Sequence, residues 1–186
     1  RFRVNQNGGI TYKGDGYEGE VEDYKFYIND TIPDTKTGNP QYPDPNGWDV
    51  NFTYPATLGD DWICSETGAV EDFHFWVSWL NDMVPDEFEN AIEKFDVYIY
   101  SDIPATVSQT GYSMPGDMLW SREFFPGEFS WEPEFDHLQG WYDPYTGDYD
   151  PENHYGCYRI DIDNFDDPFI QQEGTIYWLV ISAHVT

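Results

Sequence analysis

Two segments of the sequence are dense in carboxylates that could bind a metal ion. The first contributes Asp161, Asp163 and Asp166, and the second contributes Asp148 and Asp150. Ca²⁺ takes six to eight oxygen ligands, and loops of this kind supply them. These five residues are the predicted Ca²⁺ ligands. The alternative is a pair of solvated acidic loops, since EF-hand spacing is absent and a chain with 36 acidic residues forms such clusters by chance.

Other metal and catalytic chemistry finds less support. The four histidines show no metal-ligand spacing, so zinc is not expected, and His74 is interpreted as a packed or surface residue. No nucleophile elbow and no Gly-rich phosphate loop is present. Glu132 and Glu134 form a carboxylate pair of the kind that a glycosidase requires, but a sequence does not reveal a cleft. We therefore predict no catalytic residue and a protein that is not an enzyme.

Aromatic residues offer a second kind of binding chemistry. Trp131, Trp141 and Tyr142 lie in loop-rich sequence. Exposed Trp and Tyr rings stack on sugar rings and form binding patches. These three residues are the candidate carbohydrate ligands, with a place in the hydrophobic core as the alternative.

The charge of the chain narrows the classes of partner. Eight basic and 36 acidic residues give a formal net charge of −28, which opposes nucleic acids and anionic membrane surfaces. The 8 Trp, 15 Tyr and 13 Phe argue against disorder, because such residues build cores and strands. No apolar stretch approaches the roughly 20 residues that span a bilayer. We expect a folded extracellular or cell-surface protein with an acidic shell and no membrane insertion.

The two cysteines, Cys64 and Cys157, lie far apart in the chain. Extracellular proteins commonly pair such thiols, so a disulfide between them is predicted. It would close a loop of roughly 90 residues and stabilise the fold by about 4–5 kcal/mol. Alternation places Cys157 on the face opposite Ile160 and Ile162, unless Gly156 forms a bulge. Two buried free thiols are the alternative.

The elements that must position these residues are strands. Apolar residues alternate with polar ones in three runs, whose apolar members are Trp48, Val50, Phe52 and Tyr54; Phe73, Phe75, Val77 and Trp79; and Phe95, Val97 and Ile99. The run 176–185 is apolar on both faces, which is typical of a central strand. Shorter candidates are 2–4, 21–28, 61–64, 118–124 and 155–162. A helical turn is indicated only at 86–92, after Pro85. The pattern predicts an all-β fold, an antiparallel β-sandwich or jelly roll.

A Pro-rich stretch divides the chain. Residues 29–47 contain four prolines and few apolar residues, which is the composition of a linker. We therefore expect a terminal β-hairpin at 1–28, a linker at 29–47 and a sandwich domain at 48–186. A lone hairpin is marginally stable in water, so residues 1–28 must pack on the sandwich, on another domain or on another chain. The absence of an initiator Met and of a signal peptide suggests a mature or excised piece of a longer protein.

Two regions resemble known modules. Residues 1–28 contain Gly19-Glu20-Val21-Glu22-Asp23-Tyr24 and resemble the end of the bacterial GEVEDY domain, a β-rich module of secreted and cell-surface proteins. Residues 48–186 resemble a domain of unknown function that often follows it in large secreted proteins of planctomycete-like bacteria; the matching runs are 58–68, 74–79, 101–105 and 112–120. The resemblance implies a secreted bacterial β-sandwich and transfers no catalytic residue.

Three functional hypotheses follow. The first is a structural module of the cell surface, a subunit of a head-to-tail filament joined by strand or hairpin complementation between copies or neighbouring domains. The second is a carbohydrate-binding module. The third, a hydrolase that uses Glu132 or Glu134, ranks last.

Overall fold

The computed structural model describes residues 42–84 and 91–186. Two expectations lie outside this part of the chain: the hairpin at 1–28 and all but the last six residues of the linker. The predicted helical turn at 86–92 lies mostly outside it as well, and its last residue, Ile92, begins a strand. None of the described residues forms a helix with the length and apolarity of a membrane span.

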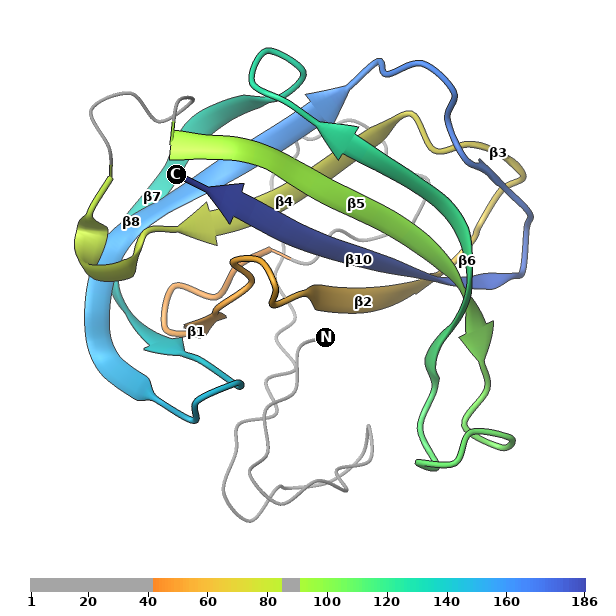
Figure 1. Ribbon diagram of the computed structural model, residues 1–186, viewed down its shortest axis with the longest axis horizontal. Coiled ribbons are helices and arrows are strands. Elements are labelled where there is room, and N and C mark those ends of the chain that lie inside the picture. The colour runs from red at the N-terminus through yellow and green to blue at the C-terminus, as the bar shows by residue number, and fades with distance from the viewer. Residues whose placement is uncertain (1–41, 85–90) are drawn as a thin grey trace.

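Two four-stranded sheets form a sandwich, which confirms the predicted fold class (Figure 1). The first sheet has the order β1 (Trp48–Val50), β7 (Ser130–Tyr142), β8 (Tyr149–Asp163) and β4 (Asp72–Ser78). The second has the order β2 (Leu58–Ile63), β10 (Ile176–Val185), β5 (Ile92–Ile103) and β6 (Met114–Phe124). Two short elements, β3 (Gly68–Ala69) and β9 (Ile170–Gln171), form a small pair, and a 3-10 turn η1 (Leu80–Asp82) follows β4. Only β1 and β7 pair in parallel among these strands.

The core lies between the two sheets and follows the predicted alternation. Phe95, Val97 and Ile99 of β5 have no exposed surface, and Ile160 and Ile162 of β8 meet them from the other sheet. Burial of each such side chain contributes about 1.5–3 kcal/mol. The run 176–185 forms β10, which lies between β2 and β5, so the predicted central strand is confirmed.

Strands β7 and β8 are long and irregular. Their pairing shifts register at three places, including one between Pro133 and Phe135. Bulges of this kind bend a strand and increase its twist. Sequence alternation did not indicate β7 because Pro133 and the acidic residues around it interrupt the apolar pattern.

Part of the outer face of the first sheet is covered by β1 and the residues that precede it. The Tyr42 ring lies 5.4 Å from the Trp76 ring, and Gln139 Nε2 donates a hydrogen bond to the Asp44 carbonyl at 2.8 Å. Ser78 Oγ donates to Asp49 Oδ2. The last six residues of the predicted linker thus pack against the sandwich.

A buried histidine lies under the same cover. His154 Nε2 is 3.1 Å from Asp49 Oδ2, and the His154 side chain has no exposed surface. This contact is not a hydrogen bond, and neither ring nitrogen of His154 has a hydrogen-bond partner among the described residues. Asp49 thereby links β1 to β4, through Ser78, and to β8.

The predicted disulfide is wrong, because Cys64 and Cys157 are both buried free thiols. Cys64 follows β2 in the second sheet, and its Sγ donates to the Glu66 carbonyl at 3.1 Å. Cys157 lies on β8 in the first sheet, opposite Ser78 at the end of β4. The end of β2 and the end of β4 lie on opposite sides of Figure 1, too far apart for a bond that needs Cα atoms within about 7 Å.

The position of Cys157 explains its burial without a bulge at Gly156. The β4–β8 register is regular from Cys157 to Asp163, so Cys157 faces away from Ile160 and Ile162, as alternation predicts. It is buried because the residues around Asp49 cover that face. Burial, followed by the negative charges of Asp49 and Glu134, raises the pKa of the Cys157 thiol to about 12.

We expect two reactive thiols per chain in the unfolded protein without any reductant, and almost none in the folded protein at pH 8. The thiolate is the reactive form, and both burial and the raised pKa of Cys157 suppress it. A colorimetric thiol titration in buffer and in denaturant measures both values. A count of zero in denaturant would show that the disulfide forms after all.

Candidate metal centre

The β4–β8 pair ends in two carboxylates that face each other. Asp72 begins β4 and Asp163 ends β8, and the register places them directly opposite. Like charges in such a cross-strand position repel each other. Neither residue pairs with a Lys or Arg in the described part of the chain. The arrangement therefore leaves two negative charges side by side at one corner of the sandwich.

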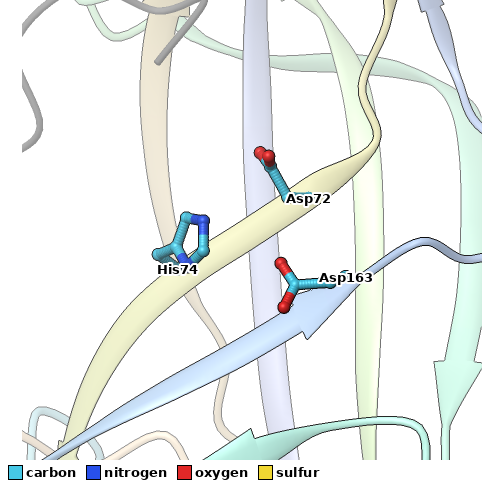
Figure 2. Close-up of side chains that lie close together, drawn as sticks. All are labelled: Asp72, His74 and Asp163. Carbon is cyan, nitrogen blue, oxygen red and sulfur yellow. The ribbon is translucent and has the colours of Figure 1, made fainter. Parts of the chain in front are cut away.

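A histidine completes this cluster. His74 follows Asp72 by two residues on β4 and so lies on the same face of the sheet. One potential ligand atom from each of Asp72, His74 and Asp163 lies within 4.8 Å of the other two. Figure 2 shows the three side chains close together, Asp72 and His74 on β4 and Asp163 at the end of β8. Asp72 and Asp163 are exposed and His74 is half-buried, so an ion could reach them from solvent.

A second layer of residues orients the histidine. His74 Nδ1 lies 2.6 Å from Asp161 Oδ1, and Arg159 Nε donates to both oxygens of Asp161 at 2.9 and 3.0 Å. A carboxylate that accepts the proton on one ring nitrogen leaves the other nitrogen free to bind a metal. Because Asp161 takes Nδ1, Nε2 of His74 is the nitrogen that a metal would use. Carboxylate–histidine pairs of this form are common around bound metals.

The hydrophobic core fixes the backbone under the site. Phe73 lies between Asp72 and His74 in sequence and points inward. Its ring stacks on Phe165 with centroids 5.4 Å apart and an interplanar angle of 8°. Phe165 follows Asp163 by two residues. The strand that carries two of the ligands and the loop after the third are thus held together by one pair of rings.

The donor set suits a divalent cation. Two carboxylates and one imidazole provide three protein ligands, and the exposed position leaves room for water to complete the coordination. Imidazole favours Zn²⁺ and other transition metals, whereas all-oxygen sites favour Ca²⁺ and Mg²⁺. The mixed set thus departs from the Ca²⁺ loops that the sequence suggested.

Two of the predicted Ca²⁺ ligands lie at this corner. Asp163 belongs to the cluster, and Asp161 supports His74. Asp166 lies in the loop after β8, where its backbone carbonyl accepts a hydrogen bond from Arg122 Nη1. The neighbouring carbonyl of Asp167 accepts one from Trp120 Nε1 at 2.9 Å. Side chains of β6 thus hold this loop.

Asp148 and Asp150 lie in and after the turn between β7 and β8. That turn is built around Asp143, whose Oδ1 accepts the Tyr145 amide at 2.8 Å and whose carbonyl accepts the Gly147 amide at 2.8 Å. Asp150 Oδ1 accepts the Glu152 amide at 3.1 Å. Among residues 42–84 and 91–186, these acids belong to no group of three close metal-ligating side chains.

His74 is the member that sequence reasoning missed. Its partners are Asp72, two residues earlier, and Asp163 on a strand 89 residues later in the chain. Only the β4–β8 register brings these residues together. The sequence did hold one sign of the site. Asp72 and His74 are two residues apart at the start of a predicted strand, and residues at i and i+2 of a strand share a face.

The predicted carbohydrate ligands do not form an exposed patch. Trp131 is half-buried, packs against the core and lies 5.7 Å from the Tyr158 ring. Trp141 and Tyr142 are also half-buried.

The two carboxylates of the hydrolase hypothesis, Glu132 and Glu134, lie 3.2 and 3.9 Å from the guanidinium of Arg159, so both face one cation.

The comparison with protein families gives one result. A family described as a domain of unknown function, DUF7901, matches residues 37–186. The chain belongs to this family. No curated protein and no solved structure matches it. The DUF7901 match begins inside the predicted linker, which agrees with the packing of residues 42–47 on the sandwich.

We expect the Asp72→Asn variant to have opposite effects with and without metal. In EDTA it should melt about 1–4 °C higher than the wild type, because it removes a like-charge pair worth about 0.2–1 kcal/mol. With Zn²⁺ or Ca²⁺ present, the wild-type DUF7901 domain should gain stability and the variant should not. Thermal denaturation with and without each ion measures both effects.

Asp166→Asn is the matched control, since it removes an exposed carboxylate from the adjacent loop while its backbone carbonyl still holds Arg122. It should retain the metal-induced gain. A wild-type melting temperature that neither EDTA nor any tested divalent ion changes would contradict the metal centre.

Proposed function

We propose that this DUF7901 chain is a non-enzymatic structural module of an extracellular or cell-surface protein, stabilised by a divalent cation. The observation that carries this proposal is the Asp72–His74–Asp163 cluster, in which two opposed carboxylates and an oriented imidazole face solvent at the end of the β4–β8 pair. A bound cation would join the two strands and neutralise a repulsion.

The charge of the chain makes such an ion useful. A formal charge of −28 opposes the compact state through self-repulsion. A divalent cation at the site would offset the charges of Asp72 and Asp163, with which no Lys or Arg of the described residues pairs, since Arg159 bonds Asp161 instead. It would therefore act on stability rather than on a reaction.

The extracellular placement rests on sequence features. The acidic and aromatic composition agrees with a secreted folded module, and residues 1–28 resemble the end of the GEVEDY domain of bacterial secreted proteins. Free thiols weaken one argument for this placement, because the expected disulfide is absent. The resemblance and the acidity remain as its support.

The assembly proposal concerns residues 1–28. These residues contain two strand candidates, 2–4 and 21–28, and a lone hairpin of two strands is marginally stable in water. The edge strand β6 pairs only with β5 among the described strands. We propose that residues 1–28 of one copy complete the sandwich of the next and so link copies head to tail.

Glycan binding is a second candidate, at a different place from the predicted residues. The Trp48 and Tyr149 rings lie 5.7 Å apart, with 41% and 62% of their surface exposed. Tyr145, in the adjacent turn, is 76% exposed. The Trp48 ring lies flat on Gly140, where an added Cβ would come within 2.7 Å of it. Exposed rings held in this way can stack on sugars.

For assembly, we expect the full chain to form linear multimers at high concentration and a chain lacking residues 1–28 to remain single particles. Negative-stain electron microscopy and light scattering distinguish the two. Circular dichroism of the shortened chain controls for folding. Equal assembly by both chains, or single particles of both, would contradict the proposal.

For glycan binding, Tyr149→Ala should lower affinity on a glycan array by roughly tenfold, the usual contribution of one aromatic stack. Tyr155→Ala removes a similarly exposed ring of β8 and serves as the control. If the wild-type chain binds no glycan, this second function is wrong.

A further inference from the structure

The outer face of the second sheet carries an unusual row of side chains. Because Phe95, Val97 and Ile99 point into the core, Tyr98 and Tyr100 of β5 point outward. In β10 the outward residues are Trp178 and Val180, which lie directly opposite Tyr100 and Tyr98.

These residues belong to two rows of side chains that cross the four strands of the sheet. The register aligns two rows, Asp61–Trp178–Tyr100–Met118 and Gly59–Val180–Tyr98–Ser121. The Tyr98 and Tyr100 rings lie 6.2 Å apart. Trp178 Nε1 donates to Asp102 Oδ1 at 3.0 Å, which fixes the indole on the sheet. We call Tyr98, Tyr100, Trp178, Val180 and Met118 the aromatic platform.

A solvent-facing side of an antiparallel sheet ordinarily carries polar residues. Here four neighbouring side chains are aromatic or aliphatic; all four are half-buried, and Met118 beside them is 57% exposed. Apolar patches with a polar rim mark interaction surfaces. The aromatic platform thus has the composition of a docking site.

The rim of the aromatic platform is acidic. Asp61 lies at one end, directly opposite Trp178, and Asp102 lies beside the same ring. Burial and the adjacent charge of Asp60 raise the pKa of Asp61, so the site disfavours the negative form of this carboxyl. A positively charged partner would relieve that cost.

The cations that could serve as this partner lie in one part of the chain. Five of the eight Lys and Arg residues precede residue 42, namely Arg1, Arg3, Lys13, Lys25 and Lys36. The remaining three are already paired with acids of the sandwich: Lys94 with Asp96 and Glu123, Arg122 with Glu128, and Arg159 with Asp161 and Glu132. Residues 15–28 also carry five acids, whereas residues 1–14 contain three of these cations and no acid, so it is the start of the chain that complements the acidic rim.

The first four residues of the chain suit both the apolar rings of the aromatic platform and its acidic rim. In Arg1-Phe2-Arg3-Val4 the basic and apolar residues alternate. In an extended conformation Phe2 and Val4 would share one face and Arg1 and Arg3 the other. Apolar side chains suit the rings, and guanidinium groups pair with carboxylates or lie over aromatic faces.

We propose that the aromatic platform is the docking surface for residues 1–28 of a neighbouring copy of this chain. The inference rests on the proposed head-to-tail assembly, and it places the acceptor on the outer face of the second sheet, with Met118 of the edge strand β6 at its border, instead of on the β6 edge alone. Phe2 and Val4 pack against Tyr98, Tyr100 and Trp178, and the arginines pair with Asp61 and Asp102.

Photo-cross-linking in the full chain tests this docking. A benzoylphenylalanine replaces Tyr100 in one sample and Tyr155, an exposed tyrosine of the other sheet, in the control. A mixture of ¹⁴N- and ¹⁵N-labelled chains distinguishes bonds between copies from bonds within one copy. We expect cross-links from position 100 to residues 1–28 of another copy, and none of these from position 155.

Arg1→Glu combined with Arg3→Glu should lower that cross-linking about threefold to tenfold, as loss of two surface ion pairs predicts, and added salt should lower it as well. Cross-links within one copy, or to another part of the chain, would overturn the inference. If multimers form without the cross-link, the platform is wrong and the assembly stands. If no multimers form under any condition, the assembly proposal fails and this inference fails with it.

Discussion

Repulsion among carboxylates is the constraint on which the arrangement of this sandwich depends. The described strands contain three cations, and each serves more than one element or more than one acid. Lys94 contacts Asp96 on its own strand and Glu123 on β6, and Arg159 of β8 contacts Glu132 on β7. Exposed pairs such as Arg159–Glu132 contribute at most about 1 kcal/mol each, whereas Asp96 is buried. They therefore do not hold the fold together, but they reduce repulsion where strands adjoin.

The aromatic core supplies the attraction that this repulsion opposes. Phe95 meets Phe75 and Phe129 edge-on at 5.1 and 5.0 Å, so one fully buried ring joins the two sheets. Phe73 and Phe165 extend the same core to the corner where the acidic residues cluster. The candidate metal centre is thus a charged surface feature whose backbone is set by packing beneath it. Along β4, the site residues Asp72 and His74 point outward, and the core residue Phe73 between them points inward.

Much of the fold could be predicted from the sequence, and the failures have physical reasons. The runs through Phe73, Phe95 and Ile176 became β4, β5 and β10 because alternation reports directly which face a strand buries. Strand β7 was missed because Pro133 and its acidic neighbours conceal the period. The disulfide was wrong because composition says where thiols are commonly paired but not which sheet carries them. The candidate metal centre could be predicted only in part, since Asp163 was visible as one of many acids while its neighbour His74 depends on strand register.

The central position of β10 has a mechanical consequence. This strand pairs with β2 along six residues and with β5 along nine, in the middle of its sheet. A force applied to its end and directed along the strand would load these hydrogen bonds together, in shear, rather than opening them one after another. Strand β1, with three paired residues at a sheet edge, would yield first under the same tension. The sandwich should therefore resist tension less at β1 than at β10.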